Sequence, residues 1–299
     1  MEPIPDAHSS GFVAIAGRPN VGKSTLVNTL LGTELSIVTP KPQTTRHRIT
    51  AILSRPRFQI VLVDTPGIHE TDAPLNRAMV DAATRSMGES DGILMVTTPG
   101  EEIDPSDRII VDLIRTARSP AVLAINKVDL VRPETLLPVI DNFSKLHDFR
   151  AIVPVSALKG AGLQDLLETV ATMLPPGPPL FPEEDVSDLP ERFFVSEMVR
   201  EQIMRLTGEE IPYKSAVVVE RFDERPGRVL IQADIHVERQ SQKKIVVGKG
   251  GAMIKRIGTA ARMKIEAFLG CKVHLELFVK VSPRWTKDAK KLNEFGYRL

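Results

Sequence analysis

Residues 17–24 read Gly17-Arg18-Pro19-Asn20-Val21-Gly22-Lys23-Ser24, and this stretch decides the fold. It matches the phosphate-binding loop pattern G-x-x-x-x-G-K-[ST] at every fixed position. The apolar run Phe12–Ala16 before it is short enough for a buried strand. Ser24–Leu31 after it has apolar residues at helical spacing and is followed by Gly32. A strand, this loop and a helix in that order form the context in which the pattern binds phosphate.

The chemistry of the loop explains its composition. Glycines let consecutive backbone N–H groups surround an anion, and the N-terminus of the following helix adds positive potential. Lys23 is expected to reach the β- and γ-phosphates of a nucleotide as a catalytic group, and Ser24 to hold Mg²⁺. The predicted phosphate contacts are Gly17, Arg18, Pro19, Asn20, Val21, Gly22, Lys23, Ser24 and Thr25.

An α/β domain with a mostly parallel sheet is predicted around this loop, because strand-like and helix-like stretches alternate from residue 12 to residue 174. The Arg-Pro-Arg turn at 55–57 indicates that one edge strand is antiparallel. Helical patterns lie near 75–88, 106–117, 134–146 and 162–173. The predicted strands are Phe12–Ala16, Ile49–Leu53, Phe58–Asp64, Gly92–Thr97, Ala121–Asn126 and Ile152–Val155.

A second motif follows the strand that ends at Asp64. An acidic residue at the end of such a strand suits the coordination shell of Mg²⁺. Gly67 would place a backbone N–H near the γ-phosphate, where it acts in catalysis. The predicted nucleotide contacts here are Asp64, Thr65, Pro66 and Gly67.

A third motif, Asn126-Lys127-Val128-Asp129, resembles the guanine-reading motif of GTPases. A carboxylate can accept from both N1–H and the exocyclic amine of guanine, whereas adenine has no matching pair of donors. We predict that Asp129 reads the base, that Asn126 braces the base and the phosphate loop, and that the Lys127 stem covers the ring. The loop Ser156, Ala157 and Leu158 completes the predicted base site, with the Ala157 N–H near guanine O6.

A threonine is expected to bind Mg²⁺ when the γ-phosphate is present, and Gln43-Thr44-Thr45-Arg46 occupies the place for it. Thr45 is the predicted ligand and catalytic residue, since a threonine beside arginine matches related GTPases. Thr44 remains the alternative.

Ile68 occupies the position where Ras-type proteins place a water-orienting glutamine. Isoleucine cannot hydrogen-bond water, so we expect slow intrinsic hydrolysis that relies on another group. Asn20 resembles the asparagine that helps some GTPases bind a monovalent cation, which would let K⁺ replace an arginine finger. The alternative is that Asn20 only shapes the loop.

The net charge differs between the two parts of the chain. Residues 1–190 hold 17 Lys and Arg against 24 Asp and Glu, a net charge of −7, whereas residues 191–299 hold 22 against 14, a net charge of +8. A basic half predicts an anionic polymer or surface as partner, against the alternative of a merely solvated face. We expect no signal peptide, because residues 1–10 have neither a basic region nor an apolar core. The apolar runs are shorter than a membrane span needs, and the one cysteine, Cys271, excludes an internal disulfide.

The Pro-rich and acidic stretch 175–190 predicts a stiff linker between a first domain, 1–174, and a second, 191–299. The second domain has the predicted order helix, strand, strand, helix, Gly-Lys-Gly-Gly loop, helix, strand. This order resembles a type II KH domain, whose G-x-x-G loop holds the backbone of a single-stranded nucleic acid. The predicted elements are Arg192–Thr207, Lys214–Phe222, Arg228–Glu238, Ser241–Val247, Ala252–Leu269 and Cys271–Val281.

Glycines in this loop would let phosphates approach the main chain, and the surrounding cations would favour them. The predicted RNA-binding residues are Lys243, Lys244, Gly248, Lys249, Gly250, Gly251, Lys255, Arg256 and Trp285.

Taken together, the chain resembles the Era family of bacterial GTPases along nearly its whole length. The residues that carry the resemblance are 17–24, 43–47, 64–67, 126–129, 156–158, 248–251 and the tail Val281-Ser282-Pro283-Arg284-Trp285. The resemblance implies a GTP-hydrolysing, Mg²⁺-dependent, monomeric and cytoplasmic switch with a KH domain. It further implies binding near the 3′ end of 16S rRNA, a role in assembly of the 30S subunit with a link to cell growth or division, and peripheral association with the inner face of the cell membrane.

Two rival functions stay open at the level of sequence. The chain could be an RNA-binding scaffold that nucleotide only stabilises, which GTP turnover with and without RNA would reveal. It could also be a membrane-traffic or cell-cycle GTPase whose KH-like domain binds protein, which binding of short RNAs would decide.

Overall fold

The computed structural model describes residues 8–39, 41, 46, 48–65, 67, 74–100 and 102–296, with the backbone alone for 74–79 and 82. The chain forms two compact units. The first comprises Met1–Ser36, Thr45–Asp72 and Asn76–Asp188, and the second comprises Ile37–Thr44, Ala73–Leu75 and Leu189–Leu299. The domain limits predicted from the sequence, 1–174 and 191–299 with a linker between them, remain a prediction.

A six-stranded sheet forms the centre of the first unit, in the order β2-β3-β1-β4-β5-β6. The β2–β3 hairpin is antiparallel and the other pairs are parallel, which confirms the mostly parallel sheet with an antiparallel edge. Val, Ile, Leu and Ala fill these strands because helices cover both faces of the sheet. The strands are β1 Ser9–Ala16, β2 Ile49–Arg55, β3 Phe58–Asp64, β4 Gly92–Thr97, β5 Ala121–Ile125 and β6 Ala151–Pro154.

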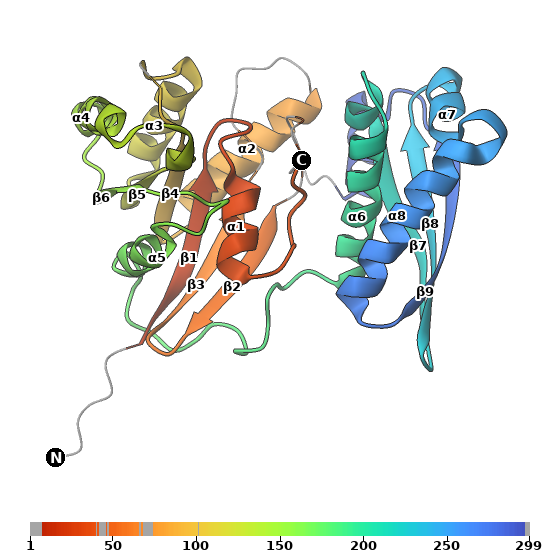
Figure 1. Cartoon of the computed structure of the whole chain (residues 1–299), viewed down its shortest axis with the longest axis horizontal. Coiled ribbons are helices and arrows are strands. Elements are labelled where there is room, and N and C mark those ends of the chain that lie inside the picture. The colour runs from red at the N-terminus through yellow and green to blue at the C-terminus, as the bar shows by residue number, and fades with distance from the viewer. Residues whose placement is uncertain are drawn as a thin grey trace. The chain divides into compact units, whose positions relative to one another are not determined.

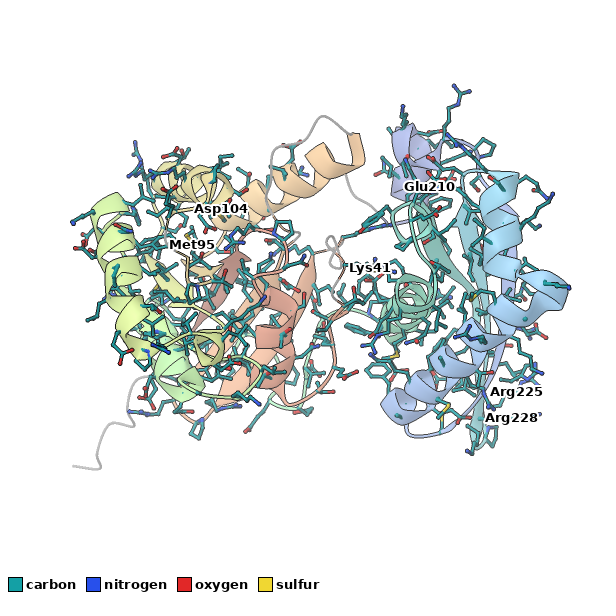
Figure 2. All side chains as sticks on the ribbon, turned by 45° about the horizontal axis from the view of Figure 1, so that its top comes forward. Lys41, Met95, Asp104, Glu210, Arg225 and Arg228 are labelled. Atoms are coloured by element: carbon teal, nitrogen blue, oxygen red, sulfur yellow. The ribbon has the colours of Figure 1, made fainter. Side chains whose placement is uncertain are left out.

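Five helices cover this sheet (Figure 1), with α1 and α5 on one face and α2, α3 and α4 on the other. On the second face, Met95 of β4 and Leu123 of β5 pack with Ile110 of α3 and Phe143 of α4 in one buried cluster. Figure 2 labels Met95 in this core, and Asp104 at the start of α3. The helices are α1 Lys23–Leu31, α2 Pro74–Gly88, α3 Pro105–Ala117, α4 Leu136–Leu146 and α5 Leu163–Ala171, with short 3-10 turns at Val128–Leu130 and Pro133–Thr135.

The parallel strands bring the three nucleotide motifs together. β1, β3 and β5 run in the same direction, so their carboxyl ends lie along one edge of the sheet. Ligands of open α/β sheets bind at that edge. The phosphate loop after β1, Asp64 at the end of β3 and Asn126 after β5 therefore meet there.

The proline-rich stretch after α5 is hydrogen-bonded along the first unit. Gln59 Nε2 donates to the Phe181 carbonyl (2.8 Å), and the Ile52 N–H donates to the Val186 carbonyl (3.0 Å). Ser187 Oγ donates to the Thr50 carbonyl (2.5 Å). Residues up to 188 thus belong to the first compact unit. A proline-rich segment has few N–H donors of its own, so side chains such as Gln59 supply part of the pairing.

The second unit is a three-stranded sheet in the order β7-β8-β9, with β7–β8 antiparallel and β8–β9 parallel. Alternate residues of β8, such as Ile231, Ala233 and Ile235, are buried on one face of the sheet. The elements are α6 Glu191–Leu206, β7 Ser215–Arg225, β8 Arg228–Val237, α7 Gln240–Val247, α8 Ala252–Leu269, β9 Lys272–Val281 and α9 Ala289–Glu294. Short 3-10 turns lie at Ile211–Tyr213, Lys249–Gly251 and Trp285–Lys287. This order confirms the predicted KH arrangement.

One helix of this unit was not predicted. α9 has only six residues, too few for an amphipathic period to be visible in the sequence. Asp288 caps it by accepting from the N–H groups of Lys290 (3.0 Å) and Lys291 (3.3 Å). Among the helices of the described residues, none is both long and apolar enough to cross a membrane.

Candidate functional site

The phosphate loop is closed around its own lysine. Lys23 Nζ donates to the carbonyls of Gly17 (2.7 Å) and Arg18 (3.1 Å), and its side chain is buried. Burial lowers the pKa of Lys23 to about 8, although the carboxylates of Asp64 and Asp107 oppose this shift. The ammonium is thus held in the mouth of the loop, where phosphates would be its counter-charge.

A glycine is required at position 22. Its φ is 99°, a left-handed conformation, and a Cβ there would lie 2.4 Å from Nδ2 of Asn126. That amide donates in turn to the Val21 carbonyl (2.8 Å). The absence of a side chain at Gly22 therefore lets the base-reading segment hold the phosphate loop directly.

The lysine gives a pH-dependent prediction. Phosphates stabilise the ammonium and raise the pKa of Lys23 above its value of about 8 in the free protein. GDP affinity should therefore be constant below pH 8 and fall above it, by up to about tenfold per pH unit until the raised pKa is reached. Equilibrium GDP titrations from pH 7 to 9 measure this.

GMP is the control ligand, since it carries the same base but lacks the β-phosphate that Lys23 is expected to contact. Its affinity should show a smaller decline over the same range. Parallel curves for GDP and GMP would contradict the assigned contact.

The residues proposed for Mg²⁺ lie together. Ser24 Oγ donates to Asp64 Oδ2 at 3.3 Å, and both side chains are buried. Ser36 Oγ also donates to Asp64 Oδ2 (3.1 Å). Hydroxyl and carboxylate oxygens are the ligands that Mg²⁺ prefers, so Ser24 and Asp64 fit the ion. Bound there, it would neutralise charge on the phosphates.

Ser36 was not singled out in the sequence. Asn28 on α1 holds its backbone: Oδ1 accepts from the Ser36 N–H (2.8 Å) and Nδ2 donates to the Ser36 carbonyl (2.8 Å). A lone serine after a helix gives no signal in a single sequence, because its role depends on this tertiary contact.

The base-reading residues Asn126, Asp129, Ser156 and Ala157 are joined by hydrogen bonds, and we call this cluster the base corner. Asp129 Oδ1 accepts from Ser156 Oγ (2.6 Å), and Asp129 itself is exposed. Asn126 Oδ1 accepts from the Ala157 N–H (2.9 Å), so Asn126 links this loop to the phosphate loop. The bracing contact predicted between Asn126 and the phosphate loop is present.

Two more residues of this corner have distinct positions. Lys127 has a φ of 64° and its Nζ donates to the Asn20 carbonyl (2.7 Å), which lays the stem along the phosphate loop. Leu158 is 75% exposed and has no packing role that would compete with a ligand.

The remaining residues predicted to bind nucleotide differ in their burial and in what they contact. Thr65 Oγ1 donates to the Ile15 carbonyl (2.7 Å) and is buried, so its side chain serves the sheet. Gly67 lies against the phosphate loop, since a Cβ there would be 2.9 Å from the Pro19 nitrogen. Thr25 follows Ser24 on α1 and is half-buried. Thr44, Thr45, Pro66 and Ile68 lie outside the described residues.

The second candidate site is the loop Gly248–Gly251 between α7 and α8. Gly250 and Gly251 have φ of 60° and 81°, and nothing lies within 4 Å of a Cβ placed on either. Their backbone therefore faces open space that a phosphate can enter. Gly248 has no such room, since a Cβ there would lie 2.8 Å from the Met253 nitrogen.

Cations surround this loop. Lys244, Lys249, Lys255 and Arg256 are exposed and Lys243 is half-buried. Over the part of the chain that the structure describes, none of the five forms an ion pair, so their charge is available to an anion. The neighbouring Ile245 is 47% exposed whereas Val246 is fully buried, so only the first could meet a base.

Trp285 departs from its predicted role in RNA binding. Its side chain is fully buried, and its indole N–H donates to the Lys214 carbonyl (3.0 Å). The ring packs edge-on against Phe295, with centroids 5.4 Å apart. The prediction came from the tail Val281–Trp285 that carries the family resemblance, but the side chain of Trp285, in the turn Trp285–Lys287, is part of the buried core.

The family described as 50S ribosome-binding GTPase matches residues 12–127, and the KH domain family matches residues 210–286. The GTPase Era of Geotalea uraniireducens is 52% identical over 289 residues, covering 96% of this chain and 97% of that protein. The GTPase Era of Syntrophus aciditrophicus is 48% identical over 290 residues, covering 96% and 95%.

Two solved structures are similar to the whole chain. A point variant of Aquifex aeolicus Era bound to GDP and AlF4⁻ is 42% identical, with a TM-score of 0.93 and coverage of 97% of this chain and 100% of that one. Era in complex with MgGDPNP and nucleotides 1506–1542 of 16S ribosomal RNA is also 42% identical, with a TM-score of 0.93 and coverage of 98% and 100%.

Proposed function

This chain belongs to the Era family of GTPases, and on that premise we propose that it assists assembly of the 30S ribosomal subunit by binding the 3′ region of 16S rRNA under the control of GTP. It is a GTPase, which converts GTP and water to GDP and phosphate. The observation that carries the proposal is the open, cationic loop Gly248–Gly251 in a chain that also holds a complete phosphate loop.

The loop suits a single-stranded RNA backbone. Its two exposed glycines let phosphates approach main-chain N–H groups, and α8 begins at once with Ala252, so its N-terminus adds positive potential. Lysines around the loop attract the RNA phosphates whatever the RNA sequence is. The exposed Ile245 offers an apolar contact to a base. The related complex with nucleotides 1506–1542 supports the 3′ region as the target.

Crosslinking of the full-length chain to 16S rRNA tests this function. We expect crosslinks between the 3′ region of the RNA and peptides that contain Gly248–Gly251 or the start of α8. Crosslinks confined to other RNA regions, or to peptides of the first unit alone, would contradict the proposal.

Nucleotide control requires a segment that senses the γ-phosphate and touches the KH domain. Residues 37–44, which precede Thr45, are grouped with the second compact unit. There Lys41 Nζ donates to the carbonyls of Met204 and of Thr207 (2.5 Å), at the end of α6. We propose that ordering of Thr45 by GTP acts on this segment.

Potassium is the proposed aid to hydrolysis. Ile68 cannot orient water, and Asn20 in the phosphate loop is exposed and has a φ of 65°. We expect GTP hydrolysis to be several-fold faster in K⁺ than in Na⁺, and Asn20→Ala to remove the difference. Turnover assays at matched ionic strength measure this, and equal rates of the parent protein in the two salts would contradict it.

Three further properties are proposed from family membership. The chain is a monomer in the cytoplasm, it associates peripherally with the inner face of the cell membrane, and it links ribosome assembly to cell growth or division. Flotation with anionic lipid vesicles tests the membrane proposal, and full recovery of the protein away from the vesicles would contradict it.

A further inference from the structure

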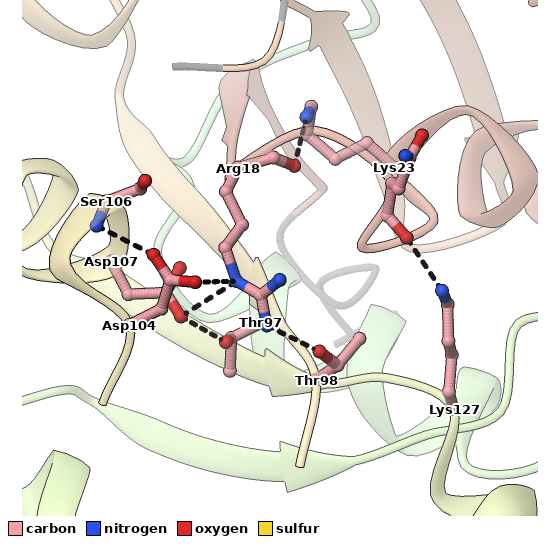
Figure 3. A network of polar contacts seen from close by, with 9 residues as sticks. Arg18, Lys23, Thr97, Thr98, Asp104, Ser106, Asp107 and Lys127 are labelled. Atoms are coloured by element: carbon pink, nitrogen blue, oxygen red, sulfur yellow. Dashed lines mark hydrogen bonds and ion pairs between the residues drawn. The ribbon is translucent and has the colours of Figure 1, made fainter. Parts of the chain in front are cut away.

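Arg18 of the phosphate loop makes its side-chain contacts away from the loop. Its guanidinium reaches the segment that joins β4 to α3 (Figure 3): Nη2 donates to Thr98 Oγ1 at 2.7 Å, and Nε donates to Asp107 Oδ2 at 3.3 Å. Asp104 Oδ2 lies 3.7 Å from the same Nε. The predicted nucleotide contact of Arg18 therefore falls to its backbone, because its side chain belongs to an internal network.

Asp107 is the centre of this network. Its side chain is only 2% exposed, and its Oδ2 also accepts from Thr97 Oγ1 at 2.7 Å. Burial raises the pKa of Asp107, while hydrogen bonds from Thr97 and the charge of Arg18 lower it in part. Burying a carboxylate costs folding free energy unless its partners compensate it. The burial of Asp107 in the first turn of α3 therefore needs an explanation.

The backbone of Arg18 explains why Asp107 is buried beside its guanidinium. The Arg18 carbonyl is one of the two acceptors of Lys23 Nζ, at 3.1 Å. A side chain fixed at Asp107 and Thr98 fixes the peptide group on which Lys23 rests. The network therefore connects α3 to the conformation of the phosphate loop.

We propose that Asp107, with Thr97 and Thr98, acts through Arg18 to position the phosphate loop for nucleotide binding. These are positioning residues, since none of the three needs to touch the nucleotide. The inference rests on the GTP-binding activity of this site and extends it to residues outside the nucleotide motifs.

Asp107→Asn is the main test. The amide has nearly the same volume but no charge, so its hold on the Arg18 guanidinium is weaker. Changes to the outer partners of metal ligands typically cost about 10- to 100-fold, and by analogy we expect GDP and GTP affinity here to fall about tenfold. The KM for GTP should rise by the same factor and kcat should stay within about twofold, because the loop still closes once nucleotide is bound.

Asp112→Asn is the matched control. Asp112 lies on the same helix, is exposed and pairs with Arg115 at 2.8 Å, so this variant makes the same chemical change without touching the network. Its GTP affinity should equal that of the parent. Thr98→Ala is a milder second variant, expected to fold normally and to lower affinity by a few-fold through loss of one hydrogen bond to Arg18.

A double-mutant cycle separates this role from general destabilisation. If Asp107 acts through Arg18, then Arg18→Met combined with Asp107→Asn should bind GTP no more weakly than Arg18→Met alone. Effects that multiply would mean that the two residues act independently and would overturn the proposal.

A pH series gives a second readout. The charged groups that face Asp107 are Arg18, Asp104 and Lys23. As the pH is lowered, Asp107 in the parent takes up a proton at a higher pH than an ordinary aspartate, because burial raises its pKa, and the parent comes to resemble the variant. The ratio of the two GTP affinities should therefore become smaller as the pH is lowered, and a ratio that does not change with pH would contradict the positioning role.

The outcomes separate this inference from the function on which it rests. Failure of the parent itself to bind GTP would refute the function. A parent that binds GTP, beside a folded Asp107→Asn variant with parental affinity at pH 7, would refute the positioning role alone.

Discussion

Changing Lys249 and Gly250 together to Asp should abolish RNA binding and leave GTP affinity and basal turnover unchanged. The change replaces one positive charge by two negative charges where phosphates approach an open backbone. Two charges about 4 Å apart interact by about 1–4 kcal/mol near a protein surface, so we expect a loss of about a hundredfold or more. Filter binding with a 16S 3′ oligonucleotide, at several salt concentrations, measures it. Residual binding should depend less on salt.

A matched control lies at the β7–β8 hairpin of the same domain. Gly227 has a φ of 73° and open space around its Cβ position, and Lys272 is exposed beside it in the register of β8 and β9. Changing Gly227 and Lys272 to Asp makes the same change in net charge and a similar backbone strain. Arg225 and Arg228 flank this turn in Figure 2. The control should keep most of the RNA affinity, and equal losses in the two variants would mean that net charge alone binds RNA.

Asp129→Asn should weaken GTP binding and shift preference toward a xanthine base. A carboxylate accepts from both guanine donors, whereas an amide accepts at one oxygen and turns an N–H toward the exocyclic amine. An unmet donor in a binding site costs about 1–3 kcal/mol, which corresponds to roughly 5- to 150-fold in affinity. Xanthine carries a carbonyl where guanine carries the amine, so XTP should regain part of the loss.

Titration of the variant with GTP, XTP and ATP measures this preference. The hydrogen bond from Ser156 Oγ to Asp129 Oδ1 can persist with an asparagine, so the corner itself should stay intact. Parental GTP affinity in the variant would show that Asp129 does not read the base.

Much of this structure could be predicted from the sequence because its elements are locally encoded. The strand before Gly17 and the helix after it follow from a run of apolar residues and from helical spacing, and the structure has β1 and α1 there. The hairpin at 55–57 and the loop between α7 and α8 were predicted from turn residues alone. Parallel topology then brings Asp64 and Asn126 to the phosphate loop without further information.

The parts that could not be predicted depend on contacts between residues far apart in the chain. Asp107 and Arg18 are separated by 89 positions, and nothing in either segment indicates that one holds the other. Trp285 was predicted to bind RNA because it lies in the tail that carries the family resemblance, whereas its side chain is buried at the turn Trp285–Lys287. The pairing of residues 181–187 with the first unit arises from the Gln59 side chain of β3 and from backbone groups of β2, which a proline-rich composition does not reveal.

The central claim is that bound GTP controls RNA binding, and the affinity of one 16S 3′ oligonucleotide for the full-length chain tests it most directly. We predict tighter binding with a non-hydrolysable GTP analogue than with GDP, by a factor of about 5 to 150, the usual range of coupling between two sites. The same factor should appear when the analogue is titrated with and without the RNA, because coupling is reciprocal. Equal RNA affinities in the two nucleotide states, with GTP and RNA both bound normally, would contradict the claim.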